Sequence, residues 1–232
     1  SRWMADSVRK SKLLGIAEIK NIPNTLDTNV FKPSTRLEAR QILGLSADKF
    51  ILMSGFMPSR KDLHKGTSYL IEAINIFIKE HHVSADEVEL VIFGNRDDKN
   101  VPVFPIRTTF LGTISDDEKL ALCYSAADVF LAPSLEDNLP NTVMESLACG
   151  TPVVAFTTGG IPDMVRHKHN GYLATYRSSP DLAAGIAWIC DADSTELSLN
   201  ARKTVEDNFS ESIIARQHIE LYKTLISKHV SA

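Results

Sequence analysis

The residues from Pro133 to Phe156 combine acidic side chains with a helix start, and this combination suits a site for a negatively charged ligand. An apolar, strand-like run ends at Ala132, and a helical pattern begins near Asn141. The first N–H groups of a helix have no partner within it, so they and the helix dipole can bind an anion such as a diphosphate. The order strand, loop, helix therefore predicts an anion site at Asn141 and Thr142.

Two carboxylates lie on either side of this helix start, eight residues apart. Glu145 lies one turn into the helix, where it can accept hydrogen bonds from the vicinal hydroxyls of a ribose. Asp137 lies at the tip of the preceding loop, from where it could meet a sugar attached to the phosphate. A structural reading is also open, because Thr142 with Glu145 matches a capping box, and Asp137 and Asn138 are common turn residues.

A second polar stretch, from Gly55 to Gly66, follows the first predicted strand and is rich in basic side chains. Arg60, Lys61 and Lys65 belong to it. A lysine in a loop between a strand and a helix acts as a point charge toward phosphate, whereas the alternative is a solvated basic loop without a ligand. If this loop and the helix start at Asn141 face one crevice, they would surround a pyrophosphate.

Six short apolar runs alternate with amphipathic segments. The runs are apolar at nearly every position, which is typical of strands buried on both faces of a parallel sheet. Repeated strand–helix units predict an α/β fold, a doubly wound, Rossmann-like parallel sheet with helices on both faces and a ligand crevice at the carboxyl ends of the strands. The predicted strands are 50–54, 88–93, 108–111, 129–132, 152–156 and 172–174.

Helix spacing and capping signals fill the intervals between the strands. Ser115 with Glu118 matches a capping box and predicts a helix that starts there. The glycines Gly159 and Gly160 lie after the fifth strand, where they permit a close approach of the backbone. Helices are predicted at 1–14, 70–78, 115–126, 181–190 and 210–227.

The composition of the 232 residues excludes several classes of protein. Hydrophobic residues make up 44% and charged residues 23%, as in a globular protein and unlike a disordered one. A net charge of −4 gives no support to nucleic-acid binding, and no apolar run is long enough to span a membrane. We expect a cytoplasmic protein with three reduced core cysteines. Because the chain opens in mid-pattern at Ser1, we also expect a piece of a longer protein.

Together, these stretches resemble the C-terminal donor-binding domain of family-four glycosyltransferases, retaining enzymes with the two-domain GT-B fold. The resemblance covers nearly the whole chain. Asp128 to Ser134 is similar to the family's "ADVFVLPS" strand, Glu145 to Val153 to "EALACGTPV", and Gly159 to Asp163 to "GG-PE". Lys65 and Gly66 match the family's phosphate lysine and the glycine that follows it. Trp3 to Asp27 resembles the closing helix, strand and linker of the N-terminal domain.

This resemblance implies transfer of a sugar from a nucleoside-diphosphate donor to an acceptor hydroxyl, with retention of the anomeric configuration. It implies no metal and no other cofactor. Lys65 would contact the diphosphate, the backbone of Asn141 and Thr142 would bind the phosphate, Glu145 would hold the ribose, and Asp137 would touch the donor sugar. Asp137, Lys65 and Glu145 are the expected catalytic residues.

Three departures from the family pattern affect the donor pocket. Asp137 replaces the usual first glutamate and has Glu136 beside it, so either carboxylate is a candidate for the sugar. Asn138 to Pro140 replace a glycine–phenylalanine–glycine loop, and Phe56 replaces an arginine for which Arg60 or Lys61 could substitute. The expected donor-binding residues are Gly55, Arg60, Lys61, Lys65, Glu136, Asn138, Asn141, Thr142 and Glu145.

The resemblance also divides the chain and names partners. Residues 1–27 would be a remnant of the N-terminal domain with its linker, 28–209 the nucleotide-sugar-binding domain, and 210–232 a helix that packs toward the missing domain. The acceptor, a glycan or a lipid-linked molecule, would bind mainly to that missing domain, in the cytoplasm or at the inner face of the membrane. Two alternatives are a non-catalytic nucleotide- or sugar-binding module and a sugar-nucleotide epimerase of the same fold.

Overall fold

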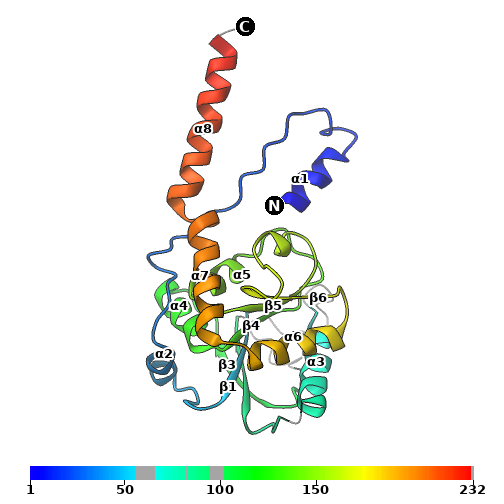
Figure 1. The fold of residues 1–232 in the computed structure, drawn as a ribbon, viewed down its shortest axis with the longest axis vertical. Helices are drawn as coiled ribbons and strands as arrows, with labels where there is room; N and C mark the ends of the chain where they lie inside the picture. Colours follow the sequence, from blue (N-terminus) through cyan, green and yellow to red (C-terminus); the bar gives the residue numbers. More distant parts are fainter. Residues whose placement is uncertain (56–65, 82, 95–101, 231–232) are drawn as a thin grey trace.

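The computed structural model describes residues 1–55, 66–81, 83–94 and 102–230, and its centre is one parallel sheet covered by helices on both faces (Figure 1). The sheet has six strands in the order β3-β2-β1-β4-β5-β6, and each neighbouring pair is parallel. This confirms the predicted doubly wound α/β fold. The strand order reverses between β1 and β4, which is where open α/β sheets form their ligand crevice.

The strands match the predicted apolar runs to within one residue at each end. Strands β2, β4 and β5 are buried along their whole length, and β1 is buried except at its two ends, because helices cover both faces. The strands are β1 (Phe50–Gly55), β2 (Val88–Phe93), β3 (Arg107–Gly112), β4 (Val129–Ala132), β5 (Val153–Phe156) and β6 (Gly171–Ala174).

The helices divide into two layers. Helices α3 and α6 pack together over one apolar core, whereas α2, α4, α5 and α7 cover the other. The helices are α1 (Arg2–Arg9), α2 (Arg36–Leu43), α3 (Thr67–Glu80), α4 (Asp117–Ala126), α5 (Asn141–Ala148), α6 (Ser179–Asp191), α7 (Ser194–Phe209) and α8 (Glu211–Val230), with a 3-10 turn at Ile161–Asp163.

Several helix predictions need correction. Helices α2 and α7 lie outside the predicted segments, and α1 ends at Arg9 rather than at residue 14. Helix α4 is not capped by Ser115. The carboxylate of Asp116 accepts hydrogen bonds from the N–H groups of Glu118 and Lys119, and this carboxylate sets the start one residue later. One predicted core cysteine, Cys190, is exposed, whereas the other two are buried.

Between α1 and the sheet domain the chain first forms turns at residues 12–16, and residues 18–25 form no strand, although the resemblance of Trp3 to Asp27 predicts one in this part of the chain. Leu26 then forms an isolated parallel bridge with Ser210. This connection is fixed where it reaches the junction of α7 and α8: the Leu26 N–H donates to the Phe209 carbonyl at 3.0 Å. Helix α8 then projects away from the sheet domain (Figure 1) and exposes the apolar side chains of Ile219, Tyr222 and Ile226. None of the described helices is long and apolar enough to cross a membrane.

Candidate functional site

A pocket of about 410 Å³ lies at the carboxyl ends of β1 and β4, where the strand order reverses. It is lined by the ends of the two strands, the loop after β4, the first turn of α5 and one residue of the N-terminal connection. The lining residues are Asn24, Ser54, Gly55, Phe130, Leu131, Ala132, Pro133, Ser134, Asp137, Leu139, Pro140, Asn141 and Thr142.

The structure brings four of the predicted site residues to this pocket: Gly55, Asp137, Asn141 and Thr142. The carboxyl ends of parallel strands meet at one edge of a sheet, and this places residues so far apart in the sequence together. The side chains of Glu136 and Asn138 are exposed and do not line the pocket. Of the two neighbouring carboxylates, Asp137 is therefore the one at the pocket.

The predicted phosphate-binding residues Arg60, Lys61 and Lys65 lie outside the described residues. The next residue, Gly66, has a left-handed φ of +68° and lies directly against the wall of the pocket. A Cβ atom on Gly66 would come within 1.9 Å of the Pro133 carbonyl oxygen, so only glycine fits there. The basic stretch therefore ends beside the loop that follows β4.

Helix α5 begins at the pocket without a side-chain cap among the described residues. Its N-cap residue is Pro140, whose carbonyl accepts the N–H of Val143 at 3.1 Å. Thr142 lies inside the first turn, so the capping box considered for Thr142 and Glu145 is wrong. The N–H groups of Asn141 and Thr142 have no acceptor within the helix, because they lie in its first turn.

Glu145 lies behind the pocket lining, one turn into α5. The hydroxyl of Tyr124 on α4 donates to its Oε2 at 2.8 Å. Burial raises the pKa of Glu145 most; the bond from Tyr124 lowers it and the charge of Asp117 raises it, and the sum is an increase. The Glu145 carboxylate is thus oriented by the hydrogen bond from Tyr124 and is largely buried. Its oxygens can still accept hydrogen bonds from further donors.

The acidic loop, residues 135–140, is held from behind by the glycine pair that follows β5. The Gly160 N–H donates to the Asp137 carbonyl at 3.1 Å, and the Thr158 hydroxyl donates to the Leu135 carbonyl at 3.0 Å. Gly159 has a φ of +52°, and a Cβ atom there would meet the Asp137 carbonyl oxygen at 1.7 Å. The close approach expected for these glycines therefore involves the acidic loop.

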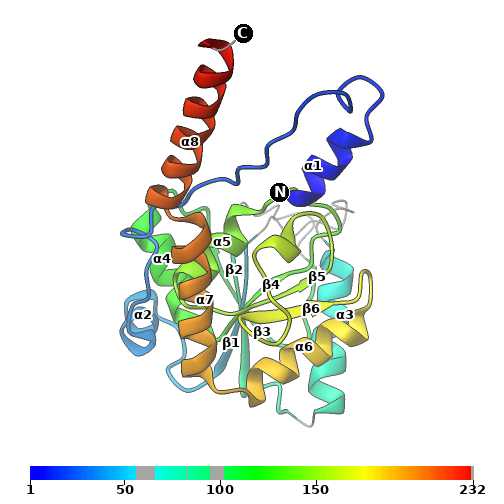
Figure 2. The same cartoon turned by 45° about the horizontal axis from the view of Figure 1, so that its top comes forward.

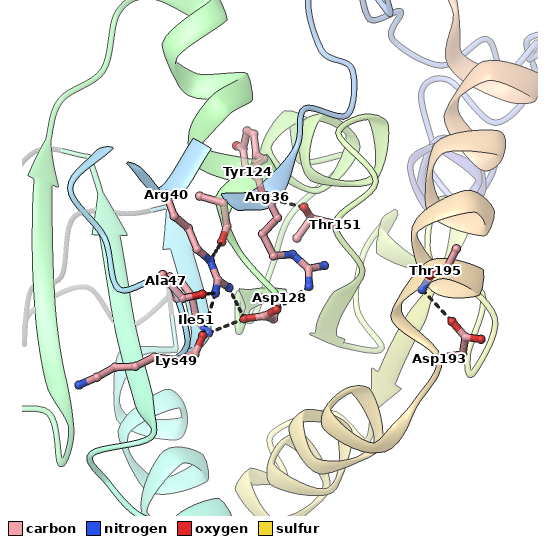
Figure 3. Close-up of polar contacts among 11 residues, drawn as sticks. Arg36, Arg40, Ala47, Lys49, Ile51, Tyr124, Asp128, Thr151, Asp193 and Thr195 are labelled. Carbon is pink, nitrogen blue, oxygen red and sulfur yellow. Dashed lines mark hydrogen bonds and ion pairs between the residues drawn. The ribbon is translucent and has the colours of Figure 1, made fainter. Parts of the chain in front are cut away.

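The opposite, amino ends of β1 and β4 hold a network of charges that are satisfied within the protein (Figure 3). Asp128 accepts hydrogen bonds from the Ile51 N–H and from Arg40, both at 2.6 Å, and forms an ion pair with Arg36 at 2.8 Å. Arg40 also donates to the carbonyls of Ala126, Ala47 and Lys49. Asp128, which opens one of the motifs noted above, therefore stabilises the start of β4 rather than the pocket.

Three polar residues of the pocket lining were not among those expected from the sequence: Asn24, Ser54 and Ser134. Asn24 reaches the pocket because Leu26 is attached to Phe209, a contact between distant parts of the chain that no local pattern announces. Ser134 is the second residue after β4, and its position near the carboxyl end of a central strand is a signal that could have identified it. No three described His, Cys, Asp or Glu side chains are grouped as a metal site requires.

The sequence profile of the family described as "Glycosyl transferases group 1" matches residues 48–192, more than half of the chain. The chain belongs to this family. The match begins just before β1 and ends just after α6, so it includes both strands that form the pocket and the whole of α5.

Similar proteins agree with this assignment. An uncharacterised glycosyltransferase of Methanocaldococcus jannaschii, MJ1607, is 29% identical over 81% of this chain and 48% of its own length. The sucrose-phosphate synthase of Thermosynechococcus elongatus superposes with a TM-score of 0.78 and 27% identity over 98% of this chain and 57% of its own. The Anabaena protein HepE, solved in complex with UDP, superposes with a TM-score of 0.71 and 25% identity over 88% of this chain and 57% of its own. The chain spans about half the length of the curated relatives that it matches.

Proposed function

We propose that the pocket at the ends of β1 and β4 binds a nucleoside-diphosphate sugar, and that this chain is the donor-binding half of a retaining glycosyltransferase. The observation that carries the proposal is the uncapped start of α5 in that pocket. Two backbone N–H donors and the positive end of a helix dipole suit a diphosphate. The UDP bound by the similar Anabaena protein is a ligand of this chemical class.

In this proposal each group of the site has one task. The N–H groups of Asn141 and Thr142 bind a phosphate, and Lys65 neutralises the diphosphate from the basic stretch that ends at Gly66. Glu145, oriented by Tyr124, accepts hydrogen bonds from the ribose hydroxyls. Asp137, at the pocket, contacts the donor sugar, and Arg60 and Lys61 add positive charge near the phosphates.

The reaction then depends on stabilising the departing diphosphate. The bond from the sugar to the β-phosphate breaks through an oxocarbenium-like transition state, and the acceptor hydroxyl attacks from the same face. Negative charge develops on the β-phosphate, and in this proposal Lys65 and the start of α5 stabilise it. One such contact lowers the barrier by about 3 kcal/mol, and in this proposal Lys65 and the start of α5 stabilise the diphosphate in place of a metal ion.

The missing parts of the reaction belong to the protein beyond this chain. We place the acceptor site, for a glycan or a lipid-linked hydroxyl, on a preceding N-terminal domain, of which residues 1–27 are the end. Helix α8, whose apolar side chains are exposed, packs toward that domain, and the sheet domain of residues 28–209 holds the donor. Such an enzyme would work in the cytoplasm or at the inner face of the membrane, and this chain alone would transfer little sugar.

Substitution of the lysine tests the proposal. In the full-length protein, Lys65→Ala should lower kcat/KM for the nucleotide sugar by about 100-fold, because one charge-assisted contact to the leaving group is lost. Lys79→Ala, at the far end of α3, is the matched control and should leave turnover unchanged. Release of UDP or GDP from a panel of nucleotide sugars provides the measurement. Unchanged turnover in Lys65→Ala would contradict the assigned role.

A non-catalytic binding module is the second candidate, and the sequence departures at Asp137 and Phe56 favour it. The two candidates differ in what the full-length protein does with a bound nucleotide sugar. Calorimetry that shows tight binding, together with no sugar transfer to any acceptor preparation, would identify a module. Transfer would identify the enzyme.

A further inference from the structure

The first turn of α1 touches two loops of the site that lie more than a hundred residues away in the sequence. The Ser1 hydroxyl donates to Asn138 Oδ1 at 2.6 Å. The Arg2 N–H donates to Asp163 Oδ2 at 2.6 Å, and the Arg2 guanidinium donates to Asp163 Oδ1 at 2.8 Å. We call these bonds the α1 docking contact. They join the start of α1 to the acidic loop and to the turn that follows the glycine pair.

The chemistry of this contact is specific. The Asp163 carboxylate accepts one bond with each of its oxygens, and the bond from the Arg2 guanidinium is charge-assisted. Its side chain is only 15% exposed, whereas that of Arg2 is 74% exposed. The Asp163 carboxylate is therefore largely buried in the surface of the sheet domain, and the exposed side chain of Arg2 on α1 contacts it.

The same contact reaches the acidic loop through Gly160. A Cβ atom on Gly160 would meet the Asn138 carbonyl oxygen at 1.8 Å and the Ser1 Cβ at 2.5 Å, so these three residues are packed together. The Gly160 N–H also donates to the Asp137 carbonyl. The backbone of Asp137 is thus held by Gly160, and the side chain of the next residue, Asn138, is held by Ser1.

Helix α1 has little other attachment. Ala5 is its one buried residue, and the apolar side chains of Trp3 and Met4 are more than a third exposed. Both ribbon views show α1 beside the sheet domain, joined to it by the long extended connection that ends near α7 (Figure 2). The start of α1 therefore docks chiefly through its polar contact, and docking can be lost without disturbing the sheet.

We propose that Asp163 is a positioning residue: by docking the start of α1, it fixes Asn138 and, through it, the orientation of Asp137 toward the donor sugar. The part that concerns the sugar rests on the proposed function. The ordering of the acidic loop by α1 does not, because it follows from the contacts alone.

The test uses Arg2→Ala and Asp163→Ala in the full-length protein, with Arg9→Ala as the matched control. Arg9 pairs with Asp6 on α1 itself and touches neither loop. Loss of the docking contact should increase hydrogen exchange of the amides of residues 135–139 by about tenfold in both variants and leave the control unchanged. The Arg2→Ala/Asp163→Ala double variant should behave like the single ones, since both remove one contact.

Sugar transfer should show the same pattern. We expect kcat for the nucleotide sugar to fall by about tenfold in both single variants, because a charge-assisted contact is lost, while the affinity for UDP, which lacks the sugar, changes less than about twofold. If the Asp163→Ala variant does not fold, the Arg2→Ala variant still tests the proposal, because the Arg2 side chain is exposed and its loss should not unfold the protein. Unchanged loop exchange in Arg2→Ala overturns the proposal. Wild-type protein that binds no nucleotide overturns the proposed function instead, and the exchange measurement still decides on the docking contact.

Discussion

The two ends of strands β1 and β4 both carry polar groups, but they use them in opposite ways. At the amino ends, Arg40 and Asp128 bond to each other and to neighbouring backbone, so their polar groups are satisfied inside the protein (Figure 3). At the carboxyl ends, α5 begins without a side-chain cap among the described residues, and Glu145 accepts a hydrogen bond from the Tyr124 hydroxyl. The difference separates residues that stabilise the fold from residues that, in the proposed function, bind a ligand.

The largest effect on stability should come from the amino ends. Asp128→Ala leaves the Arg40 guanidinium, which is 5% exposed, without its carboxylate. An uncompensated buried charge costs about 3–5 kcal/mol, so we expect a loss of that size in the free energy of unfolding. Urea denaturation measures it, with Asn141→Ala at the carboxyl ends as the comparison, since this exposed substitution should cost about 0.5 kcal/mol or less. Equal stabilities for the two variants would remove the distinction between the ends.

A second substitution affects both stability and binding. Gly66→Ala forces a Cβ atom against the Pro133 carbonyl and strains a left-handed residue, so the free energy of unfolding should fall by about 2–3 kcal/mol and nucleotide affinity should fall as well. Gly44→Ala is the control. Gly44 has nearly the same φ, +66°, but open space around it, so only the strain of about 1 kcal/mol remains, with no change in affinity. Similar losses in both variants would mean that the close approach at the pocket contributes nothing.

Glu145→Gln should weaken binding and not weaken the fold. Burial, the largest influence, raises the pKa of Glu145, so its folded pKa lies above the unfolded one. The protonated carboxyl group makes its full contribution to the free energy of unfolding at low pH. This contribution is lost as the pH rises through the pKa that Glu145 has in the folded protein. Glutamine carries no charge, so the variant should gain stability relative to wild type as the pH rises above 4.5, the ordinary pKa of a glutamate. Its nucleotide affinity should fall about tenfold, since a charged acceptor is lost. Thermal melts at several pH values and calorimetry with UDP measure both, with the exposed Glu118→Gln as the control.

Tyr124→Phe should have the smallest effect. It removes the hydroxyl that orients Glu145 but keeps the ring, which packs edge-on against Phe93 and Phe130. The loss of one hydrogen bond costs about 1 kcal/mol. Because that bond lowers the pKa of Glu145, its loss should move the acid limb of nucleotide binding to higher pH. A binding profile against pH that is the same as for wild type would show that Tyr124 does not tune the carboxylate.

The strands and four of the pocket residues could be predicted because they depend on local patterns and on one general rule. Fully apolar runs predicted the sheet, and the rule that ligands bind at the carboxyl ends of parallel strands selected Gly55 and Asn141. That the loops after these two strands face one pocket was a hypothesis, because the sequence alone does not show that they converge. Helix α7 was outside the predicted helices because its buried positions, such as Leu197 and Ala201, are few among charged and polar residues. The positions of Asn24 and α1 depend on long-range contacts to Phe209 and Asp163, which no periodicity reveals.

The central claim is that the backbone at the start of α5 binds the diphosphate, and one pair of variants tests it most directly. Asn141→Pro removes an N–H group at the first helical position, where proline is well tolerated. Pro140 before it already has the extended ψ of 121° that a following proline requires. Asn141→Ala removes the side chain and keeps the N–H. We predict that calorimetry gives UDP affinity at least about tenfold weaker for Asn141→Pro, whereas Asn141→Ala stays within about twofold of wild type. Equal UDP affinity for Asn141→Pro and Asn141→Ala, with both folded, would contradict the account.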